Sequence, residues 1–135
     1  MEAREYLEQV NKLKKKIESL KKLSDYYDRM SYSLPGQDFT RERVDHTPSY
    51  DAPFVKWIYK KIETDDLIAK LEKDLVILKD EVSTAIDKME NIDYKNVLYL
   101  RYIEGLTWED IGAKIYASER TARRYHNAAL KEFVP

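Results

Sequence analysis

Hydrophobic residues recur at alternating three- and four-residue steps from about Glu2 to Met30. The spacing is interrupted at Ser24, where the next apolar residue is due. Charged side chains, including the run Lys14 to Lys16, fill the positions between. This pattern predicts a long amphipathic helix with a narrow, heptad-like apolar seam. The seam positions are Tyr6, Val10, Leu13, Ile17, Leu20 and Tyr27.

A second and more regular seam predicts another long helix. Its positions are Ile68, Leu71, Leu75, Leu78, Val82, Ala85 and Met89. The segment Ser31 to Pro53 lies between the two seams, and its Pro, Gly, Ser and Thr residues cannot continue a helix, so we expect a loop there. The apolar residues from Phe54 to Ile62 either cap the helix pair or begin the second helix early.

The two seams can be covered in two ways. A long connection lets the second helix fold back, which gives an antiparallel hairpin within one chain. Alternatively, the seams pair between two protomers as a coiled coil, which makes the protein a homodimer. No Asn or Lys occupies a seam position to indicate a register, so both arrangements stay open at this point.

Three shorter helices are predicted after residue 91. Asp93 is the expected N-cap of the first, which runs to Ile103 and stops at Gly105. Thr107 is expected to cap the second helix and Ser118 the third. The organisation predicted is therefore all-α, with residues 1–91 as a long-helix segment and 92–135 as a separate domain.

Composition excludes several classes of protein. The 135-residue chain has three Gly and four Pro, and 36% of its residues are charged, which suits long helices. It has no Cys and two His, so neither a metal site nor another cofactor is expected. Its N-terminus has no apolar signal region and no segment is apolar enough for a membrane span, so we expect a cytoplasmic protein.

Charge is nearly balanced over the whole chain, with 24 basic and 25 acidic residues, but it is not balanced locally. Between Lys114 and Lys131 the basic side chains outnumber the single carboxylate of Glu119. Two short helices joined by a tight turn, the second of them basic, are typical of a helix-turn-helix that places its last helix in the major groove of DNA.

The expected contacts with DNA are of two kinds, those with base edges and those with backbone phosphates. Residues near the start of the last helix can reach base edges, and those predicted to do so are Glu119, Arg120, Thr121, Arg123 and Arg124. Residues at helix ends suit the phosphates, and the predicted ones are Thr107, Lys114, Ser118 and Lys131. Trp108 and Ile111 are expected to pack between helices. His126 is expected at the boundary of the core or facing a phosphate.

The run from Leu100 to Gly112, together with Ser118 to Tyr125 and Ala129-Leu130, resembles region 4 of bacterial sigma factors. The wider arrangement resembles small phage and prophage regulators, the late-gene activators of the ArpU and RinA type. This resemblance implies a sigma-region-4-like helix-turn-helix domain that binds promoter DNA through its last helix. It covers about a third of the chain, and the first ninety residues do not offer the promoter-melting region of a complete sigma factor.

Two hypotheses on function follow. The first is a sequence-specific, double-stranded-DNA-binding transcriptional regulator, encoded by a phage or prophage and dimeric through its long helices. The second is a helical adaptor that binds RNA polymerase or another protein through its coiled segments. An enzyme is not expected, because adjacent carboxylates such as Glu109 and Asp110 point in different directions on a helix and no nucleophile, phosphate-loop or metal motif is present.

Overall fold

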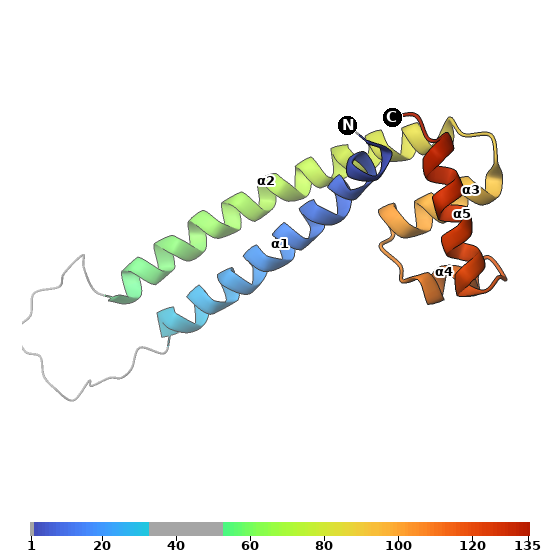
Figure 1. The fold of residues 1–135 in the computed structure, drawn as a ribbon. Coiled ribbons are helices and arrows are strands. Elements are labelled where there is room, and N and C mark those ends of the chain that lie inside the picture. Colours follow the sequence, from blue (N-terminus) through green and yellow to red (C-terminus); the bar gives the residue numbers. More distant parts are fainter. Residues whose placement is uncertain (1, 33–52) are drawn as a thin grey trace, which may run out of the picture. The chain divides into compact units, whose positions relative to one another are not determined.

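A computed structural model describes residues 2–32 and 53–135. Every regular element in these residues is helical, which confirms the all-α prediction (Figure 1). Most of the predicted loop between Ser31 and Pro53 lies outside the described residues. In chain order, the elements are α1 (Ala3–Tyr32), α2 (Pro53–Asp87), α3 (Ile92–Leu98), the π-helical turn η2 (Tyr99–Ile103), α4 (Trp108–Lys114) and α5 (Glu119–Glu132).

The start of the second long helix, which the sequence pattern leaves open, lies at Pro53. Proline is well suited to the first turn of a helix, because the backbone N–H that it lacks has no partner within the helix there. The apolar residues from Phe54 to Ile62 therefore belong to α2 and do not form a separate cap.

The contacts divide the chain into two compact units. Unit 1 joins Met1–Lys15 to Lys73–Pro135, and unit 2 is Lys16–Glu72. Each long helix thus contributes one part to unit 1 and the other part to unit 2. The predicted boundary near residue 91 marks the end of a long helix, whereas unit 1 continues across it.

Unit 1 has a core that helices from both ends of the chain build together. Leu7 and Val10 of α1 are fully buried in the same cluster as Val82 and Ile86 of α2. The C-terminal helices complete this cluster with Leu98, Tyr102, Ile103, Ala129 and Phe133. A second, smaller cluster packs the short helices on one another, with Val97 of α3, Ile111 of α4 and Ala122 of α5 buried together. Helices this short are not stable alone, so they need both clusters.

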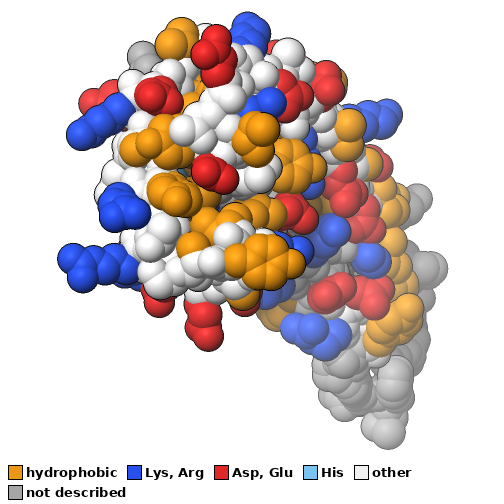
Figure 2. All heavy atoms as spheres, turned by 90° about the vertical axis from the view of Figure 1, so that its right-hand side faces the viewer, with side chains coloured by type: hydrophobic (Ala, Val, Ile, Leu, Met, Phe, Trp, Pro, Cys, Tyr) orange, Lys and Arg blue, Asp and Glu red, His pale blue; other side chains and the backbone are white. Residues whose placement is uncertain are grey.

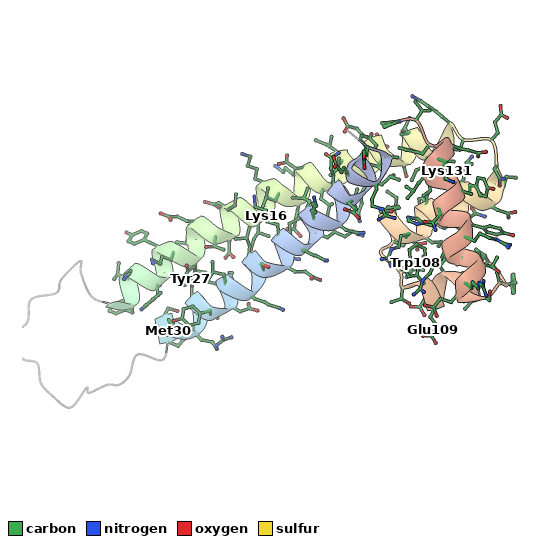
Figure 3. All side chains as sticks on the ribbon, in the orientation of Figure 1. Lys16, Tyr27, Met30, Trp108, Glu109 and Lys131 are labelled. Carbon is green, nitrogen blue, oxygen red and sulfur yellow. The ribbon has the colours of Figure 1, made fainter. Side chains whose placement is uncertain are left out.

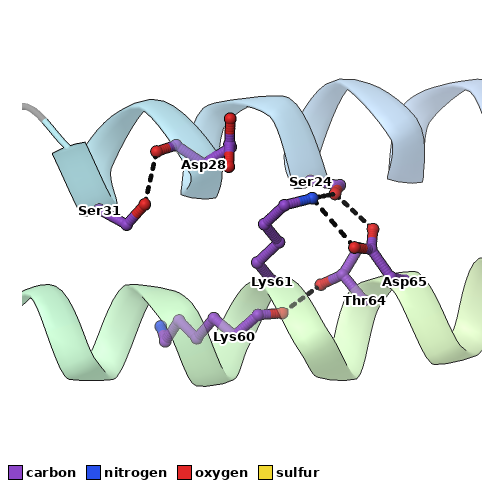
Figure 4. A network of polar contacts seen from close by, with 7 residues as sticks. All are labelled: Ser24, Asp28, Ser31, Lys60, Lys61, Thr64 and Asp65. Carbon is purple, nitrogen blue, oxygen red and sulfur yellow. Dashed lines mark hydrogen bonds and ion pairs between the residues drawn. The ribbon is translucent and has the colours of Figure 1, made fainter.

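In unit 2 the position that interrupts the first seam is buried and hydrogen-bonded. The Ser24 hydroxyl donates to Asp65 Oδ1 at 2.5 Å, and the Lys61 ammonium lies 3.0 Å from Asp65 Oδ2 and 3.2 Å from Ser24 Oγ (Figure 4). The hydrogen bond from Ser24, followed by that from Lys61, lowers the pKa of the Asp65 carboxyl. Ser24 therefore supplies a register contact between the two helices.

Further contacts in unit 2 agree with an antiparallel pairing inside one chain. The rings of Tyr27 and Trp57 stack with centroids 5.8 Å apart, and Lys21 lies 3.3 Å from the Glu72 carboxylate. Partners on α2 move towards higher numbers as those on α1 move towards lower numbers, which is the order that a hairpin requires. In unit 2 the two long helices therefore pair with each other as an antiparallel hairpin within one chain.

Three of the four predicted end signals of the short helices are present. Gly105 has a φ of 72°, Thr107 Oγ1 accepts from the Asp110 N–H, and Ser118 Oγ accepts from the Thr121 N–H. The prediction that Asp93 is an N-cap is wrong. Asn91 has that role, because its Oδ1 accepts from the N–H groups of Asp93 and Tyr94 at 2.9 and 3.2 Å.

Ile86→Ala tests the shared core of unit 1. Ile86 is 1% exposed, so removal of its side chain should lower the free energy of unfolding by about 2–4 kcal/mol, measured by urea denaturation. The matched control is Ile77→Ala on the same helix, because Ile77 is 61% exposed and its loss should cost less than about 1 kcal/mol. Equal losses for the two variants would contradict the burial described.

Candidate nucleic-acid interface

Helix α5 has one buried face and one exposed face. Its buried residues are Ala122, His126 and Ala129, which recur at steps of four and three residues. The intervening positions carry Arg120, Arg124, Asn127 and Lys131, all exposed. At about 100° of rotation per residue, these four lie on the side of the helix opposite the buried face.

Arg120, Thr121, Arg123, Arg124 and Asn127 line an open hollow on this exposed side. We call these five residues the arginine surface. Figure 2 looks onto the side of the molecule that carries the C-terminal helices, where Lys and Arg side chains project at the left edge and both hydrophobic and acidic side chains lie across the face. The structure thus brings together four of the five residues predicted to reach base edges.

The fifth predicted residue, Glu119, interacts with one of the arginines. Its Oε1 lies 2.7 Å from Arg123 Nη2, and both side chains are about half exposed. Arg120 and Arg124 have no carboxylate partner among the described residues, although the Arg124 guanidinium lies 5.9 Å from the centre of the Tyr125 ring. The arginine surface therefore contains one guanidinium paired with a carboxylate, that of Arg123, and two guanidinium groups, those of Arg120 and Arg124, that can each bind an external anion.

A tight connection positions α5 against α4. Gly112 of α4 is packed so closely that a Cβ atom there would lie 2.9 Å from the Ala117 carbonyl oxygen. Tyr116, in the same connection, has a φ of 57°, in the left-handed region, and its side chain is 97% exposed. Gly112 therefore sets how closely the two helices approach, because any larger residue would collide with the backbone of the turn.

The residues predicted to contact phosphates are distributed around this pair of helices. Thr107 and Lys114 lie at the two ends of α4, and Ser118 precedes α5. Lys131, which is labelled in Figure 3, lies in the last turn of α5. The Thr107 and Ser118 hydroxyls already act as caps, and Ser118 also donates to Thr121 Oγ1 at 2.9 Å. Their side chains are therefore less available than the exposed amino groups of Lys114 and Lys131.

Trp108 and Ile111 pack between the helices, as predicted. Ile111 is fully buried, and Trp108 packs against the same cluster. The Trp108 ring has the Arg101 guanidinium 4.4 Å from its centre and the His126 ring 4.7 Å away. Trp108 thus belongs to the packing between the C-terminal helices.

The prediction for His126, at the boundary or facing a phosphate, is wrong. His126 is buried, and its Nε2 lies 2.6 Å from the Tyr102 hydroxyl. Burial, with a smaller contribution from the nearby Arg4 charge, lowers the pKa of His126 from 6.5 to about 4. The ring is therefore neutral at pH 7 and contributes hydrogen bonding and packing to the core.

Sequence reasoning missed one residue of the arginine surface, Asn127, and one residue of the turn before α5, Tyr116. Asn127 lies seven residues after Arg120 and three after Arg124, a helical spacing that indicates their common face in retrospect. Tyr116 gave no signal, because a left-handed φ at a tyrosine is not readable from residue type. Both side chains are exposed, Asn127 within the arginine surface and Tyr116 in the turn.

The described ranges, 2–32 and 53–135, contain neither a metal-binding cluster nor a membrane-spanning helix. No group of three or more His, Asp or Glu residues is arranged to hold a metal ion there. No helix in those ranges has a stretch long and apolar enough to cross a membrane.

Comparison with known families identifies the chain. Residues 55–134, which include most of α2 and all the C-terminal helices, match the family described as "Protein of unknown function (DUF1492)". The chain belongs to this family. Neither a curated protein nor a solved structure matches it.

His126→Gln tests the buried neutral histidine. Since the pKa of His126 is lower in the folded protein than its ordinary value of 6.5, the unfolded chain takes up the proton first as pH falls. The stability provided by His126 is complete above about pH 6.5 and is lost towards pH 4. At about 1.4 kcal/mol per pKa unit, the loss is about 3 kcal/mol.

Urea denaturation between pH 7 and pH 4 measures this dependence. The wild-type protein should lose more stability over that window than His126→Gln, whose amide can still hydrogen-bond to Tyr102 but does not titrate. The same pH slope for both proteins would mean that His126 does not cause the loss.

Proposed function

We propose that this member of the family is a sequence-specific DNA-binding transcriptional regulator. In this proposal α4 and α5 act as a helix-turn-helix, and α5 enters the major groove with its arginine surface towards the bases. The observation that carries the proposal is the exposed arginine surface on the side of α5 opposite its buried face. Major-groove recognition needs a helix whose one face is buried against a core and whose opposite face is exposed and basic.

The side chains of this surface differ in what they can read. Arg120 and Arg124, which have no carboxylate partner in the described residues, can each donate two hydrogen bonds to O6 and N7 of guanine. The Asn127 side-chain amide can donate a hydrogen bond to N7 of adenine and accept one from its N6 amino group. Glu119 can accept a hydrogen bond from the amino group of cytosine once its ion pair with Arg123 is broken. The two residues would then exchange one internal ion pair for two contacts with DNA.

Contacts with the DNA backbone complete the interface. The exposed amino groups of Lys114 and Lys131 suit phosphates on either side of the groove, and the first N–H groups of α5 add donors behind Ser118. The exposed Tyr116 hydroxyl can donate to a phosphate from the turn. These contacts position α5 and add affinity that falls with salt.

The class of regulator follows from the resemblance to sigma-factor region 4 and to phage late-gene activators of the ArpU and RinA type. The capped α4 and α5, the left-handed Gly105 and the buried Ile111 occupy the positions through which the sequence resembles that region. We therefore propose a phage or prophage regulator that acts in the cytoplasm on promoter DNA, with RNA polymerase as a further partner.

Arg120→Ala with Arg124→Ala tests base recognition. Binding to DNA from upstream of its own gene is measured by fluorescence anisotropy over a range of salt concentrations. Two lost guanidinium contacts should weaken binding at least about tenfold and flatten the salt dependence. Arg123→Ala alone should have a smaller effect, because Arg123 is already paired with Glu119.

The control is Lys21→Ala with Lys22→Ala, which removes the same charge from exposed positions in unit 2. It should bind DNA as the wild-type protein does. Equal affinity of the Arg120/Arg124 variant and this control, or wild-type binding that does not respond to salt, would refute the proposal.

A protein-binding role is the second candidate function, and the exposed surface of α2 favours it. Phe54, Ile58 and Ile62 recur every four residues, with Tyr59 beside them, and these four side chains are between 41% and 63% exposed. Contiguous exposed apolar side chains are typical of interaction sites. A second copy of this chain is the partner to test first, because helix-turn-helix proteins commonly bind two DNA half-sites as dimers.

Ile58→Glu with Ile62→Glu tests this pairing. Light scattering coupled to size-exclusion chromatography should give the mass of two chains for the wild-type protein and of one chain for the variant. Ile77→Glu, an exposed isoleucine on the same helix outside this row, should remain a dimer. A wild-type protein with the mass of one chain would reject self-association and leave the row to a different protein partner, such as RNA polymerase.

A further inference from the structure

A second basic site lies in unit 1, in a cavity of about 430 Å³. One face of α1 provides its first wall through Arg4, Lys12 and Lys15. The opposite wall comes from Arg101 of η2, Trp108 of α4 and His126 of α5. The volume falls within the range of small-molecule sites. Because α1 and the C-terminal helices share one core, both walls belong to the same packed unit.

The charges around this cavity are strongly unbalanced. Arg4, Lys12, Lys15 and Arg101 line it together with one carboxylate, that of Glu8. Lys12 and Lys15 have no ion-pair partner among the described residues. Four cations around one hollow repel one another, and in a chain of net charge −1 they do not follow from composition. A bound anion would relieve this repulsion.

The aromatic wall is held in place before any ligand arrives. The Trp108 ring contacts both the Arg101 guanidinium and the His126 ring, which lie 4.4 and 4.7 Å from its centre. Arg101 also donates to the Leu106 carbonyl at 3.0 Å, and the Tyr102 hydroxyl is hydrogen-bonded to His126. A ligand would therefore meet a rigid surface, which reduces the entropy lost on binding.

This cavity is distinct from the arginine surface. His126 lies on the buried face of α5, whereas Arg120 and Arg124 lie on its opposite face. The residues that line the cavity and those that line the hollow of the arginine surface do not overlap. A ligand in the cavity leaves the arginine surface free.

We propose that this cavity binds a phosphate-bearing small molecule through Arg4, Lys12, Lys15 and Arg101. Several cations that converge on one hollow match the several oxygens of a phosphate or polyphosphate group. The Trp108 wall adds an apolar surface for the rest of the ligand. Phosphates of the DNA backbone have the same chemistry, and the experiment separates the two sources. The proposal does not depend on DNA binding by α5.

The experiment uses the 135-residue chain with Trp57→Phe. The sequence has two tryptophans, and Trp57 lies in unit 2, so fluorescence in this background reports on Trp108 alone. Inorganic pyrophosphate is titrated at constant ionic strength, and adenosine triphosphate is titrated by calorimetry. Saturable binding of either probe is expected. No saturable binding of either one would overturn the proposal.

Two matched variants test the site itself. Lys12→Gln with Lys15→Gln should raise the Kd for pyrophosphate at least tenfold, since both side chains are exposed and their replacement leaves the core intact. Lys21→Gln with Lys22→Gln removes the same charge from unit 2 and should leave the Kd unchanged. An equal loss in both variants would show general charge attraction and overturn the site.

A DNA duplex distinguishes the source of the phosphate. For a small-molecule site, the Arg120/Arg124 variant keeps pyrophosphate binding, and the Lys12/Lys15 variant keeps DNA binding. If the duplex displaces pyrophosphate and the Lys12/Lys15 variant loses DNA affinity, the DNA backbone is the ligand, which overturns the small-molecule proposal. Loss of the DNA-binding function without loss of pyrophosphate binding would refute the first proposal alone.

Discussion

The rest of unit 1 depends on the burial of Leu7 and Val10 of α1 against Val82 and Ile86 of α2. This apolar contact creates the surface on which η2 and α5 place Tyr102 and Ala129. Because α3 and α4 are only seven residues each, they need tertiary packing. Helix α3 buries Leu98 on this surface, and α4 buries Ile111 in a second cluster with Val97 and Ala122. Helices α3 and α5 and the turn η2 are therefore supported in part by residues near the opposite end of the chain, which an independent helix-turn-helix would not require.

The same dependence explains the chemistry around His126. Its ring is buried where α5 meets η2 and α4, and it holds Tyr102 by a hydrogen bond while the Trp108 ring packs on it. A neutral imidazole can be buried at lower cost than a charged one, and the lowered pKa reflects this. The histidine thus links the buried face of α5 to its neighbours and leaves the opposite face to the arginines.

Polar and apolar contacts have different roles in the two units. Unit 1 is held mainly by its two apolar clusters, whereas unit 2 combines a narrow seam with the Ser24, Lys61 and Asp65 network. Seam residues such as Ile17 and Ile68 contribute burial, but a repeating seam permits more than one register. A buried hydroxyl with one carboxylate partner favours one register, because a shift would leave the hydroxyl unsatisfied.

The sequence by itself determined the helices, both seams, three of the end signals and the basic character of α5, because these depend on periodicity and local backbone chemistry. Only the tertiary structure decided that the seams pair within one chain and that Leu7 and Ile86 join the core of the C-terminal helices. It also decided that Asn91 caps α3, that His126 is buried and that Asn127 joins the arginines. Burial and partner choice depend on segments far apart in the chain, which a local pattern does not contain.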